Sequence, residues 1–141
     1  MRPDELAAGM AAEMTRTVTE TDVVLYAGLT GDFNPVHMDA VAAAASRFGG
    51  RIAHGMLTAG LVSAVLGTRL PGPGAVYLSQ TLRFTAPVRI GDTVTARVEV
   101  LEVGERGRVR LATTARTQDG AQVLEGEALV WVPAPPRAGP D

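Results

Sequence analysis

The fold is decided by residues 54–74, which read HGMLTAGLVSAVLGTRLPGPG. Residues 56–70 are the most apolar part of the chain and have the length and composition of a helix. The prolines and glycines of residues 71–74 end it, because proline cannot continue a helix and glycine favours a turn. The helix has little polar face, so we expect it to be buried nearly all round.

After Gly74 the pattern changes to a period of two, which is typical of half-buried strands. The apolar rows are Val76, Leu78, Leu82 and Phe84, then Val94, Ala96, Val98 and Val100, then Leu124, Ala128, Val130 and Val132. Residues 109–115 supply a further strand, and turns near residues 104–107 and 119–120 make the set antiparallel hairpins. A helix followed by such strands must pack on their apolar face, so we predict an α+β domain. Gln80 interrupts its row, either as a satisfied core group or as a pocket residue.

The N-terminal part predicts shorter elements. Residues 14–18 form a first strand, and the polar run of residues 19–22 is a capping box ahead of a helix over residues 23–29. Asp39 then caps an alanine-rich helix that ends near Gly49 and Gly50.

Between these elements lies the run Tyr26-Ala-Gly-Leu-Thr-Gly-Asp-Phe-Asn-Pro-Val-His37. Gly31 can adopt backbone angles closed to other residues, Asn34 can close a turn through its side chain, and Pro35 pushes Asn34 toward extended angles. Asp32 and His37 therefore project from one tight turn. A carboxylate and an imidazole on a rigid bend can hold a single water between them, as general acid and base chemistry near neutral pH requires.

Two other interpretations of this run are open. Aspartate and asparagine are common in turns, so the run also fits a purely structural bend. Asp32, Asn34, His37 and Asp39 alternate like metal ligands, but the calcium-loop pattern needs glycine at its sixth and glutamate at its twelfth position, where this chain has His37 and Ala43. The chain has no cysteine and only one other histidine, so we expect no metal site.

Composition narrows the function further. At 141 residues the chain has room for one domain, which we place at residues 1–132, followed by a disordered proline-rich tail over residues 133–141. A net charge of −2 argues against a nucleic-acid partner. All 13 basic side chains are arginines, which excludes Schiff-base chemistry and leaves arginine as the cation for a phosphate-bearing substrate.

The chain carries no sign of a membrane or export signal. Residues 1–10 do not read as a secretory signal, and the uncharged stretch 55–68 is too short to cross a bilayer. We therefore expect a cytoplasmic protein without a membrane partner.

Four features together resemble the MaoC-type (R)-specific enoyl-CoA hydratases. They are the run from Tyr26 to His37, the His54-Gly55-Met56 helix start, Ser63 on that helix, and residues 78–88 (LSQTLRFTAPV) followed by Gly91-Asp92. The resemblance covers about residues 10–132. It implies a hot-dog fold, in which an antiparallel sheet wraps a long central helix, and a homodimer with active sites near the subunit interface. It also implies that an acyl thioester is the substrate and that no cofactor takes part.

The resemblance implies that Asp32 and His37 activate the same water, and we assign His37 as the general base. Ser63 matches a family position that hydrogen-bonds near this pair, although a serine within a buried helix can also bond to its own backbone. The amides at the helix start, with Gly55 allowing close approach, form an oxyanion site, unless Gly55 only relieves packing. Asn34 is also a candidate substrate-binding residue, and Leu66 is a candidate wall of the acyl pocket. The resemblance does not assign His54 the acid or base role, and we interpret it as a structural residue that caps the helix or braces the loop.

Three functions are therefore compatible with the sequence. The favoured one is reversible syn hydration of a trans-2-enoyl-CoA to the (R)-3-hydroxyacyl-CoA. The alternatives are a hot-dog acyl-CoA thioesterase and a non-catalytic subunit that binds acyl thioesters. Neither the acyl chain length nor the choice between CoA and acyl-carrier protein follows from the residues.

Overall fold

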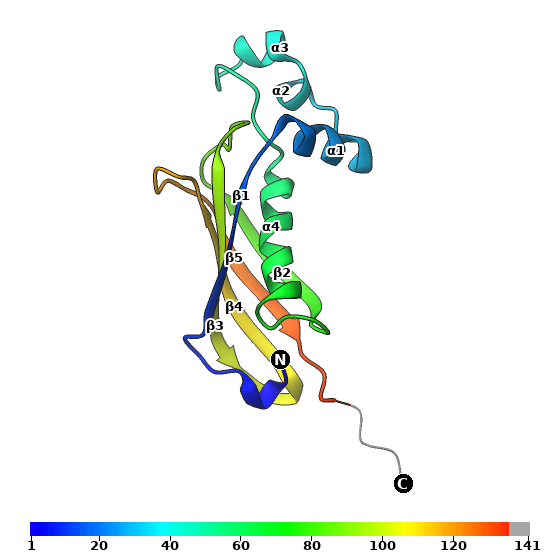
Figure 1. Ribbon diagram of the computed structural model, residues 1–141, viewed down its shortest axis with the longest axis vertical. Coiled ribbons are helices and arrows are strands. Elements are labelled where there is room, and N and C mark those ends of the chain that lie inside the picture. The colour runs from blue at the N-terminus through cyan, green and yellow to red at the C-terminus, as the bar shows by residue number, and fades with distance from the viewer. Residues whose placement is uncertain (136–141) are drawn as a thin grey trace.

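The computed structural model describes residues 1–135, in which one long helix lies in the curve of a five-stranded antiparallel sheet (Figure 1). The helix is α4 (Gly55–Thr68). The strands are β1 (Ala11–Thr17), β2 (Val76–Phe84), β3 (Thr93–Val103), β4 (Arg108–Arg116) and β5 (Gln122–Trp131), in the order β1-β3-β4-β5-β2. The expected α+β hot-dog architecture is confirmed.

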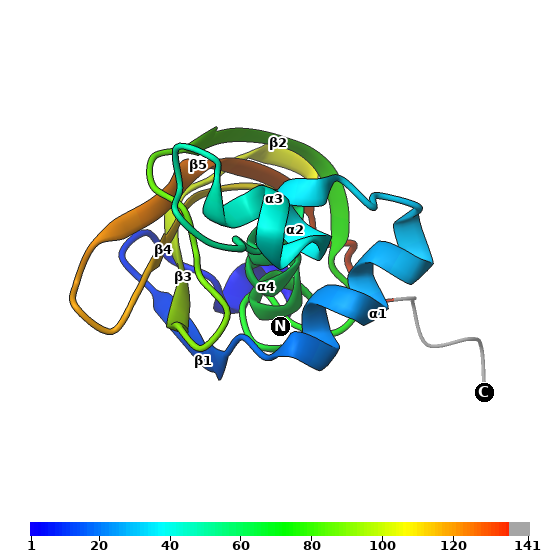
Figure 2. The same ribbon diagram turned by 90° about the horizontal axis from the view of Figure 1, so that it is seen from above.

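Three short helices form a cap over one end of α4. They are α1 (Glu20–Thr30), α2 (Pro35–Met38) and α3 (Ala40–Ala44), and Figure 2 shows them lying above the helix while the sheet curves round it. Two 3₁₀ turns, η1 (Pro3–Glu5) and η2 (Glu105–Gly107), lie at the opposite end. No helix among residues 1–135 is both long and apolar enough to span a membrane.

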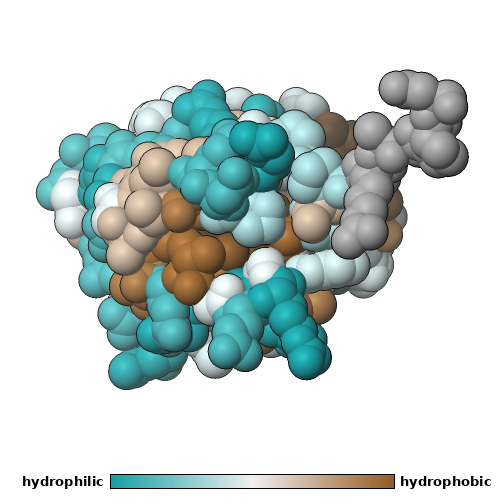
Figure 3. All heavy atoms as spheres, turned by 90° about the horizontal axis from the view of Figure 1, so that it is seen from below, coloured by the Kyte–Doolittle hydropathy of each residue, from teal (hydrophilic) through white to brown (hydrophobic). Residues whose placement is uncertain are grey.

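The core lies between α4 and the sheet. The expected inward rows of β3 and β5 are buried, as is the inner face of α4, and the residues concerned include Val62, Val65, Val94, Val98, Val100, Leu124 and Val130, each at most 1% exposed. Figure 3 shows apolar side chains gathered at the centre of the end opposite the cap and ringed by polar ones. The apolar interior therefore reaches the surface at that end.

The expectation that α4 is buried all round is wrong. Gly60, Gly67 and Thr68 are exposed, and the Met56 side chain is 53% exposed. The physical reason is that a single sheet meets a helix along one side only, so the opposite side stays open within one chain.

The N-terminal elements are those predicted from the sequence, but their bounds differ. The capping box is present, because the Thr19 hydroxyl and the Asp22 carboxylate each accept a hydrogen bond from the other residue's backbone N–H. Asp39 caps α3 as expected. That helix ends at Ala44 rather than near Gly49, because the Ser46 hydroxyl donates to the Ala43 carbonyl and accepts from the Phe48 amide, which replaces the helical pattern with a turn.

Strand β2 departs from the predicted alternation. A bulge lies between Tyr77 and Ser79, so Leu78 has no partner in β5 and Val76 pairs with Trp131 on the outer face. Tyr77 and Gln80 instead share the inner face, opposite Val130 and Ala128. The prediction was therefore wrong for Val76, whereas Leu78 lies in the bulge and lines the groove beside α4.

Gln80 satisfies both interpretations offered for it. Its side-chain amide donates to the Thr113 hydroxyl at 2.9 Å and to the Thr81 carbonyl at 2.7 Å, and it accepts from the Tyr77 phenol, whose pKa burial raises. It also lines a groove beside α4.

The expected tail over residues 133–141 falls largely outside the described part of the chain. Residues 133–135 follow β5 without regular secondary structure, and residues 136–141 are not described. The domain bounds of 1–132 stay a prediction.

Gly126 in β5 gives a test of the packing between β5 and β2. A Cβ atom there would lie 1.8 Å from the Thr81 carbonyl oxygen, which belongs to the neighbouring backbone and cannot move aside cheaply. We expect Gly126→Ala to lower the free energy of unfolding by about 2 kcal/mol or more, measured by chemical denaturation.

Gly28 in α1 is the matched control. A Cβ atom there meets nothing within 4 Å, so Gly28→Ala should raise stability by about 0.5–1 kcal/mol through helix propensity. Equal denaturation midpoints for the two variants would contradict the described strand packing.

Candidate active site

The turn between α1 and α2 is held by its own side chains. Gly31 ends α1 with φ 81°, a left-handed conformation that favours glycine. The Asp32 carboxylate accepts from the Asn34 amide at 3.2 Å, and the Asn34 side-chain oxygen accepts from the Val36 amide at 3.3 Å. The prediction that Asn34 closes this turn is confirmed, and it leaves the Asp32 side chain exposed at the bend.

His37 is held in one orientation within α2. Its ring is buried, and Nδ1 lies 2.8 Å from the Ile52 carbonyl oxygen. Because a carbonyl only accepts, Nδ1 must carry the hydrogen, and in the neutral imidazole Nε2 then carries the lone pair. The structure therefore presents Nε2 as the basic nitrogen.

Arg51 braces the same helix from outside. Its Nε donates to the His37 carbonyl at 2.6 Å, and Nη1 donates to both oxygens of the Glu20 carboxylate at 2.8 and 2.9 Å. Arg51 therefore links the start of α1 to α2, the two helices that flank the turn.

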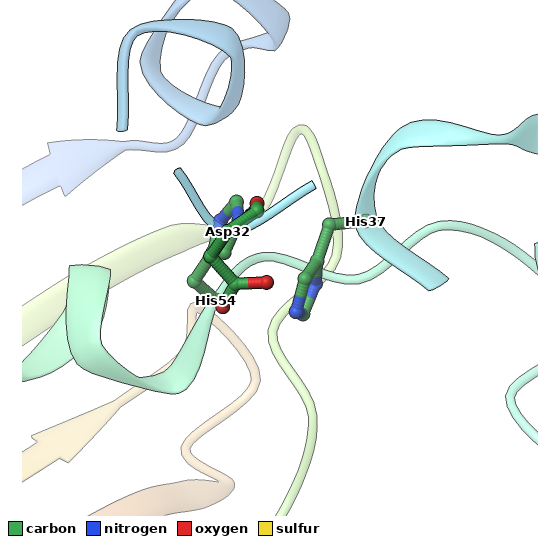
Figure 4. A group of neighbouring side chains, drawn as sticks. All are labelled: Asp32, His37 and His54. Atoms are coloured by element: carbon green, nitrogen blue, oxygen red, sulfur yellow. The ribbon is translucent and has the colours of Figure 1, made fainter. Parts of the chain in front are cut away.

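Asp32 and His37 share a cleft of about 430 Å³ beneath the cap. Its walls come from the start of α4, the end of β2 with the loop that follows, and the loop after α3; they include Phe48, Gly55, Thr58, Phe84, Pro87 and Val88. Figure 4 shows an Asp32 carboxylate oxygen on the side of the His37 ring. The predicted pair is therefore brought together at the wall of one largely apolar cleft.

Sequence reasoning missed the contribution of His54. This residue precedes α4 and is 2% exposed, its ring stacks on His37 with centroids 3.9 Å apart, and its Nε2–H donates to the Asp32 carbonyl at 2.9 Å. The available signal was that His54 is the second of only two histidines in the chain and begins its most apolar helix.

The three residues are also the cluster best able to hold a metal within residues 1–135, since one ligand atom from each of Asp32, His37 and His54 lies within 4.8 Å of the others. The donor geometry does not fit an ion. One nitrogen of each imidazole is already bonded to a carbonyl, and stacked rings direct their in-plane lone pairs side by side rather than toward one point.

Gly55 is the first residue of α4 and lies on the cleft wall. A Cβ atom there would lie 2.8 Å from the Phe84 ring, so the packing interpretation of Gly55 has a clear physical basis. The His54 side chain, which stands at the N-cap position, makes no hydrogen bond to the first amides of the helix. Arg47 is the one arginine on this wall, and no carboxylate in the described chain lies within 4 Å of its guanidinium.

Ser63 and Leu66 lie further along α4 and do not line this cleft. Both line a cavity of about 140 Å³ against β5, and Ser63 also lines the groove of about 340 Å³ between α4 and β2. The single chain therefore does not bring Ser63 to Asp32 and His37. Met56 lines both the cleft and the groove, so the two spaces adjoin at its side chain.

A curved sheet around one helix, with a carboxylate and an imidazole from the α1–α2 turn beside the helix start, is the arrangement expected of the hot-dog hydratases and dehydratases as a class. The MaoC like domain family matches residues 4–121, and the chain belongs to this family. The resemblance found in the sequence is confirmed.

Named relatives are similar over nearly their whole length. A 3-hydroxybutyryl-CoA dehydratase of Methylorubrum extorquens is 55% identical over 138 residues, which cover 97% of this chain and 87% of the relative. An (R)-specific enoyl-CoA hydratase of Rhodospirillum rubrum is 53% identical over 132 residues, or 93% and 91% of the two chains. The unliganded R-hydratase PhaJ1 from Pseudomonas aeruginosa superposes with a TM-score of 0.91 at 46% identity, covering 99% of this chain and 94% of that one.

Proposed function

We propose that the chain is an (R)-specific enoyl-CoA hydratase, a hydro-lyase that reversibly adds water to a trans-2-enoyl thioester. The observation that carries the proposal is the His37 tautomer. The Ile52 carbonyl holds the hydrogen on Nδ1, so Nε2 presents a lone pair to the cleft that also receives the Asp32 carboxylate. The names of the relatives support the same reaction type.

The reaction requires a water oxygen at C3, a proton at C2, and stabilisation of the negative charge on the thioester oxygen. His37 Nε2 takes a proton from the water that Asp32 orients, the water oxygen bonds to C3, and the C2–C3 π electrons move toward the thioester carbonyl. The electrons return as C2 takes up a proton delivered through the pair. A coupled acid and base share this proton, so the step belongs to Asp32 and His37 together. No cofactor is needed.

The start of α4 supplies the oxyanion site in this proposal. The Gly55 amide lies at the positive end of the helix dipole, on the cleft wall, and the absence of a capping side chain leaves the first amides open to a ligand. A side chain at this position would displace the Phe84 ring, which packs closely against Gly55.

The acyl chain extends from the cleft past Met56 into the groove beside Ser63, and Leu66 forms the wall of the adjoining cavity. Arg47 gives the cleft mouth a cation for the phosphates of CoA or of a carrier-protein arm. Ser63 acts as a groove residue in this arrangement.

Crotonyl-CoA distinguishes this function from its alternatives. A hydratase removes the conjugated absorbance and keeps the thioester, a thioesterase releases free thiol, and a binding subunit does neither. Because one water lies between two groups on the same turn, we expect syn addition and the (R)-3-hydroxybutyryl product, checked by chiral chromatography. An (S) product would contradict the arrangement of the pair.

Substitution of the pair tests the roles of the two residues. We expect Asp32→Asn and His37→Gln each to reduce turnover by about 10²-fold or more while the protein stays folded. The double variant should reduce turnover by far less than the product of the two single reductions, because both residues act on one water. Near-normal turnover in either folded single variant would exclude it from the catalytic role.

We also propose a two-fold symmetric homodimer in which the partner completes the wall of the acyl channel. Strand β2 is an edge of the sheet, and its Val76, Tyr77 and Leu78 side chains are each 41–42% exposed. A long edge strand with exposed apolar side chains is a liability that pairing with a second copy removes. The open side of α4, which faces away from its own sheet, would be covered in the same contact.

Leu78→Glu tests this dimer. A charge at the β2 edge should shift light-scattering mass toward the monomer and lower the specific activity, because the channel loses a wall. Val41→Glu is the matched control, since Val41 lies on α3 and is already 82% exposed. A monomeric wild-type protein with full specific activity would refute the proposal.

A further inference from the structure

His54 contacts both members of the catalytic pair. Its Nε2–H donates to the Asp32 carbonyl at 2.9 Å, and its ring stacks on the His37 ring at 3.9 Å with an interplanar angle of 30°. The Asn34 backbone also links the two residues, since its N–H donates to the Asp32 carboxylate at 3.2 Å and its carbonyl accepts from the His37 amide at 2.9 Å. Neither bond reaches the His37 ring, which is held by the Ile52 carbonyl. Within residues 1–135, His54 is the side chain that joins the two.

A second aromatic ring also contacts His54. Tyr26 of α1 packs against the imidazole with centroids 4.5 Å apart and an interplanar angle of 47°. At the point where α4 begins, the imidazole therefore contacts one ring from α1 and the His37 ring from α2. His54 therefore makes contacts that link α1, α2 and the start of α4.

Packing alone does not explain why this buried position holds a histidine. Because Nε2 donates its hydrogen to a carbonyl, Nδ1 is an acceptor, and residues 1–135 offer this buried nitrogen no hydrogen-bond partner. An unpaired buried acceptor costs stability, which an apolar residue of similar size would avoid. Nor does His54 cap the helix that it precedes. What the imidazole adds is its bond to Asp32 and its flat face against His37.

We propose that His54 is a positioning residue that fixes the Asp32 carboxylate and His37 Nε2 relative to each other. This inference rests on the proposed hydration reaction. Holding the Asp32 backbone sets where its carboxylate lies, and the stacked ring prevents the His37 imidazole from tilting out of the cleft. Because the reacting groups must meet the same water, a small misplacement of either one lowers turnover more than substrate binding.

Three variants separate the two contacts. His54→Asn removes both, His54→Gln keeps a donor that can reach the Asp32 carbonyl, and His54→Phe keeps the ring and removes the unpaired nitrogen. We expect His54→Asn to lower kcat for crotonyl-CoA by about 10–100-fold with KM changed less than about threefold. The glutamine variant should recover part of this loss. The phenylalanine variant should keep or raise the unfolding midpoint while its kcat still falls.

Two controls exclude a general loss of structure. Val109→Ala shortens a fully buried side chain on β4, which does not line the cleft, and should lower the unfolding midpoint while leaving kcat per folded molecule unchanged. Adding His54→Asn to His37→Gln should lower kcat far less than it does in the wild type, because a positioning residue acts through the group that it positions.

The outcomes distinguish the inference from the function on which it rests. A wild-type protein that does not hydrate crotonyl-CoA contradicts the proposed function. A hydrating wild type with normal kcat in His54→Asn or His54→Phe overturns the role of His54, as does a full additional loss in the His37→Gln background. If only the His54→Phe variant folds, its kcat alone tests the role of His54: a lowered value supports that role and a normal value overturns it.

Discussion

The packing of one face of α4 against the curved sheet is the constraint on which the rest of the structure depends. Val62 and Val65, both fully buried, fix the helix against the strands, and this contact sets where the helix begins. The beginning of the helix in turn brings His54 and Gly55 beneath the cap. The site combines the start of α4 with a separate turn, so the distances between its groups are fixed only if the helix cannot shift along the sheet. The burial of branched side chains prevents such a shift.

Much of this arrangement follows from the sequence because its causes are local. The turn of residues 31–37 has its own chemistry, with a glycine at positive φ and an asparagine that caps the next helix, so the pairing of Asp32 with His37 could be predicted. The alternation in β3 and β5 could be predicted for the same reason, since the strands have one buried and one solvated face. The resemblance to the MaoC-type family added the roles of the residues, which local patterns alone left open.

The features that the sequence did not reveal depend on contacts between distant segments. The bulge at Leu78 moves the inner face of β2 onto Tyr77 and Gln80, and it is defined only by pairing with β5. The open side of α4 follows from the presence of one sheet, whereas its composition suggests burial on every side. The stacking of His54 on His37 joins residues 17 positions apart through the folding of the cap, and no spacing rule predicts it.

Met56 lies where the cleft beside the Asp32–His37 turn meets the groove between α4 and β2, which receives the acyl group in the proposed function. The groove is built from α4 and β2, and the turn is built from residues before them in the chain. Substitutions that enlarge or narrow the groove therefore leave the geometry of the turn intact. Evolution can alter substrate range and reaction chemistry independently on such a scaffold, and duplicated copies of the gene could diverge in the acyl groups they accept while retaining one mechanism.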